Sequence, residues 1–233
     1  MSWLYLLLDA GTLFFPVVLS FDKNVHYLDH WKRVLLSTLL IAIPFIAWDI
    51  YFTAKGVWGF NPNYLTGIEV YNLPIEEVLF FIVVPFACTF IYQCCKFYLK
   101  RFNFNRLNIF MALFIFLYAC VVFFQNTSGA YSSWVFISTL IVLLFWIKNF
   151  NLNFIGISFI ISILPFLVMN GALTGQYTDA PIVWYNDLQN ASIRLFTIPV
   201  EDVVYCFSLI ASNFITFEFL NKQHEENLSL IHI

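Results

Sequence analysis

The sequence predicts an all-α membrane protein whose seven transmembrane helices form two parallel three-helix repeats joined by a linking helix. The first observation is composition: of 233 residues, 61% are hydrophobic and only 11% are charged, whereas a soluble domain has about 25% charged residues. The second is that apolar runs long enough to cross a bilayer recur along most of the chain. The third is a short acidic motif that occurs twice, each time at the start of a long apolar run.

The first predicted three-helix unit covers residues 1–100. Its apolar runs lie at roughly residues 3–20, 34–53 and 75–98. No basic region precedes the first run, and no small-residue cleavage site follows it. We therefore expect this run to be a retained helix and not a signal peptide.

A fourth run, at roughly residues 107–124, would form the linking helix within residues 101–130. The second three-helix unit, residues 131–233, has runs at roughly 132–148, 154–170 and 199–220, followed by a polar tail. Two connections, 54–74 and 171–198, are longer than the others, and their Tyr and Trp residues suit the membrane interface. Segments of this size often cover a site, although a plain interfacial loop is the commoner case.

Lysine and arginine predict the orientation of the chain. The connections 21–33, 96–106 and around 148, with the tail from residue 221, hold nine of the 11 basic residues. The other two, Lys55 and Arg194, lie in the long connections on the opposite side. Because cytoplasmic loops carry the excess of basic residues, we expect a multi-pass protein of the cell membrane. Its N-terminus would be outside, its C-terminus cytoplasmic, and its acidic motifs on the outer side.

Matching residues at a nearly constant offset predict that the two units are repeats. At an offset of 121 residues, Pro44 matches Pro165, Phe45 matches Phe166 and Asp49 matches Asn170. At an offset of 125 residues, Pro74 matches Pro199, Glu76 matches Glu201, Glu77 matches Asp202, Phe80 matches Tyr205 and Gln93 matches Glu218. An offset of four helices preserves direction, so the units should be parallel. The first run should then match the fifth, although no residue-level match supports that pair.

The two acidic motifs are the strongest candidates for chemistry. We predict that their carboxylates, Glu76, Glu77, Glu201 and Asp202, are the catalytic residues. We predict supporting roles for Asp9, Asp49, Asn170 and Arg194. Adjacent helix positions point about 100° apart, so one member of each pair should face the bundle interior while the other supports it. The sequence does not say which.

A structural reading of these motifs competes with the functional one. Proline and acidic residues are favoured in the first turn of a helix, where the carboxylate complements the helix dipole. Capping does not explain Asp9 and Asp49, which lie inside apolar runs where carboxylates are costly. It also does not explain why the motif occurs twice on the same predicted side of the membrane.

Paired carboxylates among aromatic residues suit proton chemistry. A close pair can divide into one protonated acid and one ionised base, and aromatic faces stabilise a nearby cation. Acid, base and an apolar, aromatic-lined cavity together favour a proton-triggered carbocation reaction on a hydrophobic substrate. The sequence has no Gly-x-Gly-x-x-Gly and no phosphate loop, so we expect no nucleotide cofactor. The cysteines and histidines have no metal-site spacing, and no basic cluster suits nucleic acid.

Several motifs together resemble the membrane-integral, non-flavin lycopene cyclases. They are Leu8-Asp9-Ala10-Gly11-Thr12 with Ser20-Phe21-Asp22, Trp48-Asp49, and the two acidic motifs. In that family two related three-span units occur as separate subunits or joined in one chain, and this sequence is similar to the joined form over nearly its whole length. The resemblance implies that Glu76, Glu77, Glu201 and Asp202 are catalytic. Asn170, in place of a second Asp, departs from strict symmetry and questions whether both halves are equally active.

The resemblance also implies a reaction and a substrate. A carboxylic acid would protonate C2 of a linear ψ-end of a carotenoid, the C5=C6 bond would close the ring onto the C1 cation, and loss of the C6 proton would leave a β-ring. The partners would be this hydrophobic substrate and the lipid bilayer, and the oligomeric state stays open. A proton-coupled small-solute transporter with three-plus-one-plus-three helices is the alternative, although the acids lie near one face of the membrane. A retinal-binding protein is disfavoured because the seventh run contains no lysine.

Overall fold

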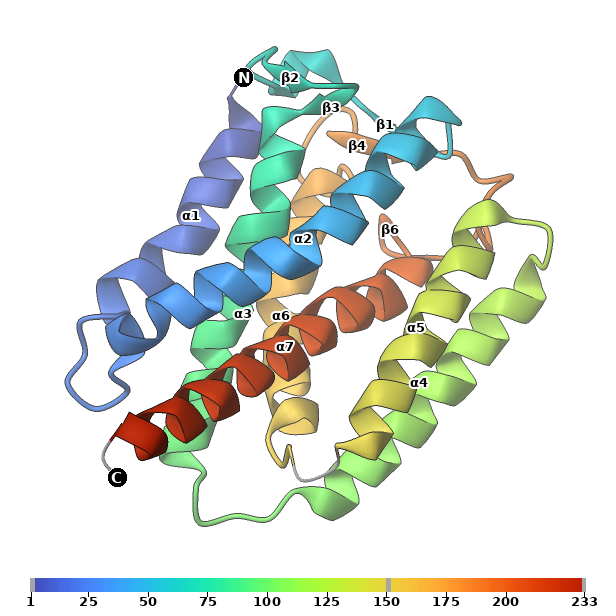
Figure 1. The fold of residues 1–233 in the computed structure, drawn as a ribbon. Helices are drawn as coiled ribbons and strands as arrows, with labels where there is room; N and C mark the ends of the chain where they lie inside the picture. Colours follow the sequence, from blue (N-terminus) through green and yellow to red (C-terminus); the bar gives the residue numbers. More distant parts are fainter. Residues whose placement is uncertain (1–2, 150–151, 232–233) are drawn as a thin grey trace.

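The computed structural model describes residues 3–149 and 152–231, with side chains up to residue 226. These residues form a helical bundle (Figure 1). The α-helices are α1 (Leu4–Leu19), α2 (Trp31–Ala54), α3 (Ile75–Tyr98), α4 (Asn105–Gln125), α5 (Ala130–Lys148), α6 (Ile155–Leu173) and α7 (Glu201–Ile231). Two short 3₁₀ helices, η1 (Tyr27–His30) and η2 (Pro62–Tyr64), lie next to α2 and within the first long connection.

Six of these helices are long and apolar enough to cross a membrane, which makes the chain an all-α, multi-pass membrane protein. The exception is α1, which is apolar but has only 16 residues. At about 1.5 Å per residue it is about 24 Å long, and a bilayer core is about 30 Å thick. The prediction of seven apolar runs is therefore confirmed as seven helices in the described residues. Six of them have the length and composition of a membrane span, and the seventh span, α1, stays a prediction.

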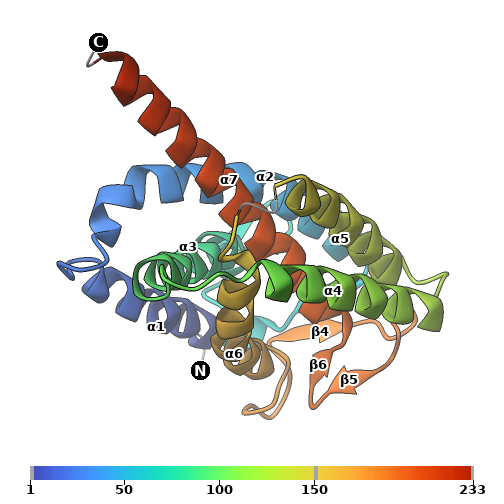
Figure 2. The ribbon, with the colours of Figure 1, turned by 90° about the horizontal axis from the view of Figure 1, so that it is seen from below.

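The two helices that carry the acidic motifs lie at the centre of the bundle. Of the six long helices, α3 and α7 are the most deeply buried. Figure 1 shows α1 to one side of them and α4 and α5 to the other, while α2 crosses in front of α3 and lies next to α7. Figure 2 shows the same helices from below. Pro74 is the residue before α3, and its fixed backbone geometry suits a helix start.

A short two-residue hairpin precedes each central helix. Strands β2 (Glu69–Val70) and β3 (Leu73–Pro74) pair before α3, and β5 (Arg194–Leu195) and β6 (Ile198–Pro199) pair before α7. The two hairpins correspond residue for residue at the offset of 125. Even their tips agree, because Tyr71 and Phe196 both adopt positive φ angles, 59° and 58°.

The two long connections meet in a third small sheet. Strand β1 (Trp58–Phe60) from the first connection pairs antiparallel with β4 (Val183–Tyr185) from the second. Gly59 lies opposite Trp184, and a Cβ at Gly59 would come within 2.3 Å of the indole ring of Trp184. The close approach of the strands therefore requires glycine at this position. The sheet joins the two halves above the end of the bundle where the acidic motifs lie.

Candidate active site

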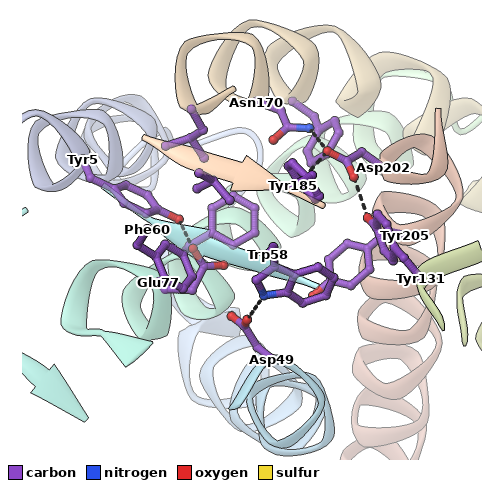
Figure 3. A pocket seen from close by; sticks show the side chains of 14 residues that line it. Tyr5, Asp49, Trp58, Phe60, Glu77, Tyr131, Asn170, Tyr185, Asp202 and Tyr205 are labelled. Atoms are coloured by element: carbon purple, nitrogen blue, oxygen red, sulfur yellow. Dashed lines mark hydrogen bonds between the residues drawn. The ribbon is translucent and has the colours of Figure 1, made fainter. Parts of the chain in front are cut away.

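A small cavity lies beneath the β1–β4 sheet, at the end of the bundle where α3 and α7 begin. Its volume is about 40 Å³, room for a few water molecules. Every helix except α4 contributes to its wall. The lining residues are Tyr5, Asp49, Trp58, Phe60, Glu77, Phe80, Tyr131, Phe166, Asn170, Leu173, Val183, Tyr185, Asp202 and Tyr205. Figure 3 shows Asp49 and Glu77 on one side of it and Asp202 on the other.

Asp202, from the first turn of α7, accepts hydrogen bonds from three side chains. The Tyr131 hydroxyl donates to Oδ1 at 2.5 Å. The Asn170 amide and the Tyr185 hydroxyl donate to Oδ2 at 2.7 and 3.1 Å. Only an ionised carboxylate accepts at both oxygens without donating, so this set of donors favours the ionised form of Asp202.

Tyr185 belongs to the β1–β4 sheet, outside the membrane helices, and serves as one of these donors. Burial raises the pKa of the Tyr185 hydroxyl well above its usual value, and the negative charge of Asp202 raises the pKa further. A raised pKa keeps the hydroxyl protonated. Tyr185 therefore remains a hydrogen-bond donor to Asp202 across the physiological pH range.

The opposite wall of the cavity holds two carboxyl groups instead of one. Glu77, in the first turn of α3, accepts a hydrogen bond from the Tyr5 hydroxyl at 2.7 Å. Asp49, near the end of α2, accepts from the indole N–H of Trp58 and from the hydroxyl of Thr53. The two carboxyl groups lie close enough to interact directly. In the second half, Asn170 takes the place of Asp49. The wall with Asp202 therefore has an amide donor at the position where the wall with Glu77 has a second acid.

The other member of each acidic pair points away from the cavity. Glu76 accepts from the backbone N–H of Thr66 at 2.6 Å, and Glu201 accepts from the backbone N–H of Ala191, also at 2.6 Å. Both contacts link a central helix to the connection that precedes it, ten residues earlier in the chain. The structure thus separates the pairs as helix geometry requires: Glu77 and Asp202 line the cavity, while Glu76 and Glu201 hold the connections.

Two predicted supporting residues lie outside the cavity wall. Asp9, in α1, is 2% exposed, and neither carboxyl oxygen has a hydrogen-bond partner among the described residues. Its acidic neighbours are Glu76, which points away from the cavity, and Glu77, which lines it. Arg194, in β5, pairs with Asp187 at 2.5 Å. Its guanidinium lies 5.9 Å from the centre of the Tyr185 ring, so Arg194 contacts a donor to Asp202 without reaching the acids.

The sequence reasoning missed five aromatic residues of the site: Tyr5, Trp58, Tyr131, Tyr185 and Tyr205. One signal could have identified two of them. Tyr5 and Tyr131 are each the second residue of their helices, α1 and α5, and each donates to the cavity acid of its own half. The pair supplies the residue-level match between the first and fifth runs that was lacking. The side chains of β1 and β4 gave no such signal, because their positions depend on pairing between distant connections.

The aromatic rings form a continuous wall around the acids. The Trp58 and Tyr131 rings meet edge to face with their centres 5.1 Å apart, and Tyr131 stacks on Tyr185 at 5.9 Å. Tyr205 extends the wall to Trp48, at 5.0 Å. Such faces attract a cation.

Comparison with known proteins gives one family. The sequence model of the lycopene cyclase family matches residues 2–95 and again residues 127–220. The chain is 30% identical over 96 residues to a bifunctional lycopene cyclase/phytoene synthase of Gibberella fujikuroi, covering 40% of this chain and 16% of that protein. It is 29% identical over 62 residues to the Aspergillus oryzae protein of the same description, covering 27% and 11%. It is 40% identical over 70 residues to the lycopene beta-cyclase of Halobacterium salinarum, covering 29% of this chain and 30% of that one. The match thus spans less than a fifth of each fungal relative, and no solved structure matches.

Proposed function

This chain belongs to the lycopene cyclase family, and on that premise we propose that it is a lycopene β-cyclase. It would convert the linear ψ-ends of lycopene into β-rings, giving γ-carotene and β-carotene, with no net oxidation or reduction. The observation that carries the proposal is the arrangement of acids around one cavity. Asp49 and Glu77 form a carboxyl pair on one wall, and Asp202 lies on the other wall among three donors.

The two walls suit different steps. Two adjacent carboxyl groups in a dry site cannot both be ionised, so the Asp49–Glu77 pair holds a proton to donate. Glu77 or Asp49 would deliver that proton to C2 of the ψ-end, which leaves a cation at C1. The C5=C6 double bond then attacks C1, and the positive charge moves into the new ring. The Tyr131, Tyr185 and Tyr205 rings would stabilise that charge during the reaction.

Asp202 would complete the reaction as the base. Its three donors favour the ionised form, so it attracts the cation and accepts the C6 proton as the ring double bond forms. Atoms and electrons balance, because one proton enters the substrate and one leaves it. The proton gained by Asp202 must return to the Asp49–Glu77 pair before the next turnover.

The remaining features of the fold fit this proposal. We propose that α1 also crosses the membrane, so that seven helices form two parallel three-helix units, residues 1–100 and 131–233, linked through residues 101–130. The matched hairpins, the paired Tyr5 and Tyr131, and the second match to the family all support two equivalent units. The distribution of basic residues supports a cell-membrane protein with its N-terminus outside.

Expression in cells that accumulate lycopene tests this function. We expect the intact protein to convert the pigment to γ-carotene or β-carotene. Glu77→Gln and Asp202→Asn should each lower conversion by about 10²–10⁴-fold, the usual contribution of a general acid or base. The matched control is Glu76→Gln, whose amide oxygen can still accept from Thr66 and which leaves the cavity intact. Unchanged lycopene with well-expressed intact protein would refute the proposal.

A further inference from the structure

A second, larger hollow lies between α1, α3 and α6. It has a volume of about 700 Å³, within the ~300–1,000 Å³ of ordinary ligand sites. The wall contains no charged side chain, and it is almost wholly apolar. One of its few polar groups, the Thr12 hydroxyl, is already used, because it donates to the sulfur of Met169 at 3.0 Å. The chemistry of this groove therefore suits a hydrocarbon.

The groove opens toward the lipid. Leu7, Phe15 and Val168 line it and are 57–66% exposed. Along α1 it extends from Leu7 to Pro16, which is about 14 Å at ~1.5 Å per residue. It therefore runs along the bundle for nearly half the ~30 Å thickness of a bilayer core, and a rod-shaped ligand could enter it sideways from the membrane.

The groove and the acid cavity are neighbours that share one lining residue. Phe166 of α6 lines both. Further along α6, Asn170 and Leu173 face the cavity, whereas Met169 and Ala172 face the groove. Helix α6 thus forms the partition between the two spaces, with the Phe166 ring at their junction.

The equivalent place in the other half is filled. There α2, α5 and α7 take the positions of α6, α1 and α3, and the space between them holds a cluster of rings. The Trp48 ring lies 5.9 Å from Trp134 and 5.0 Å from Tyr205, and Phe52 packs on Trp134 at 5.7 Å. Trp48 stands at the position of Met169 at the offset of 121. In the second half these rings therefore occupy the place that the groove takes in the first half.

We propose that the groove binds the polyene chain of a linear carotenoid and that Phe166 is the gate through which its ψ-end reaches the acids. This inference rests on the proposed cyclase function and adds the path of the substrate. With the Phe166 ring in its present position, the cavity, at about 40 Å³, is too small for the end group of a carotenoid. Phe166 must turn aside as the end group enters, and the rest of the polyene stays in the groove and the adjoining lipid.

Gly11 offers a test that should not disturb the fold. It lines the groove, and a Cβ added there meets no atom within 4 Å. Gly11→Leu would therefore add a side chain to the groove wall at a position where its Cβ meets no neighbour, and leucine favours a helix more than glycine does. The matched control is Ala10→Leu, because Ala10 is the neighbouring small residue of α1, is exposed, and does not line the groove.

The measurements are lycopene binding and cyclisation by purified protein in lipid nanodiscs. Binding is read from the carotenoid absorbance that stays with the protein. We expect Gly11→Leu to weaken binding and to lower kcat/KM by at least tenfold, and Ala10→Leu to leave both unchanged. Equal activity of the two variants would overturn the proposal, and so would a groove occupied by lipid acyl chains that lycopene does not displace.

The two proposals fail in distinguishable ways. If the intact protein binds lycopene without converting it, and only Gly11→Leu reduces that binding, the groove proposal holds and the cyclase proposal fails. If the intact protein makes rings and Gly11→Leu does so equally well, the cyclase proposal holds and the groove proposal fails.

Discussion

At the residue scale, the two carboxylates of each acidic motif have different roles. Glu76 and Glu77 are adjacent, as are Glu201 and Asp202. The second carboxylate of each pair faces the cavity, and the first accepts a hydrogen bond from a backbone N–H. The second difference is Asn170, which donates to Asp202 where Asp49 approaches Glu77 as another acid. In the proposed mechanism, this single amide in place of a carboxyl would give the two halves opposite proton chemistry.

Tyr185 gives a prediction about pH at this scale. Tyr185→Phe removes one donor from Asp202, and a hydrogen bond to a charged group contributes about 1.5–3 kcal/mol, so we expect kcat to fall by about tenfold or more. The pKa of Tyr185 is raised well above its usual value of 10.0, so its hydroxyl stays protonated up to pH 10. Titration of Tyr185 therefore causes no loss of activity between neutral pH and pH 10. The variant and the intact protein should therefore have alkaline limbs of the same shape.

The measurement is kcat across neutral and alkaline pH for purified protein. Trp184→Phe is the matched control, because alternate residues of a strand point to opposite faces and Trp184 does not line the cavity. An alkaline loss of activity seen in the intact protein and absent from Tyr185→Phe would contradict the prediction, since it would mean that Tyr185 titrates in that range.

At the scale of elements, Glu201 is expected to stabilise the second long connection. Its Oε1 accepts from the backbone N–H of Ala191 and from the Ser132 hydroxyl, at 2.6 and 2.7 Å. Glu201→Ala leaves both buried donors unpaired, which costs about 1–3 kcal/mol for each group. Glu201→Gln retains an acceptor oxygen and should recover most of that loss. Thermal unfolding in detergent would measure both, and an equal loss of Tm in the two variants would argue against this structural role.

The helices could be predicted from the sequence, whereas the connections could not. Apolar length alone locates α2 to α7, because a membrane helix satisfies its own backbone hydrogen bonds. Of the residues that the doubled motif indicated, Glu77 and Asp202 line the cavity together with Asp49 and Asn170. The β1–β4 sheet depends on pairing between residues about 125 apart, which no local pattern encodes. Trp58 and Tyr185 reach the cavity only through that pairing, so no local sequence pattern distinguishes them from other interfacial aromatics.

At the scale of the whole molecule, each half supplies a part of the site that the other lacks. The first unit brings Tyr5, Asp49 and Glu77, and the second brings Asn170 and Asp202. Packing of α2 and α3 against α6 and α7 joins the units. We therefore expect that the two units can be made as separate polypeptides, but that both are needed for activity.

Splitting the chain between Lys100 and Arg101 tests this dependence, because the cut falls in the connection between α3 and α4. We expect the two pieces, expressed together in lycopene-accumulating cells, to restore ring formation, and neither piece alone to do so. Pairing the first piece with a second piece that carries Asp202→Asn should give no product. Ring formation by one piece alone would show that a single unit contains a sufficient site.

The groove has a consequence for stoichiometry. Lycopene has two identical ends, and the groove proposed above would lead one end at a time to the cavity. Each encounter would therefore close one ring, and the half-finished molecule would withdraw into the bilayer and reverse its direction before its other end could enter. The proportion of one-ringed to two-ringed pigment would then be set by how soon a released molecule meets a protein again, and so by the crowding of the membrane.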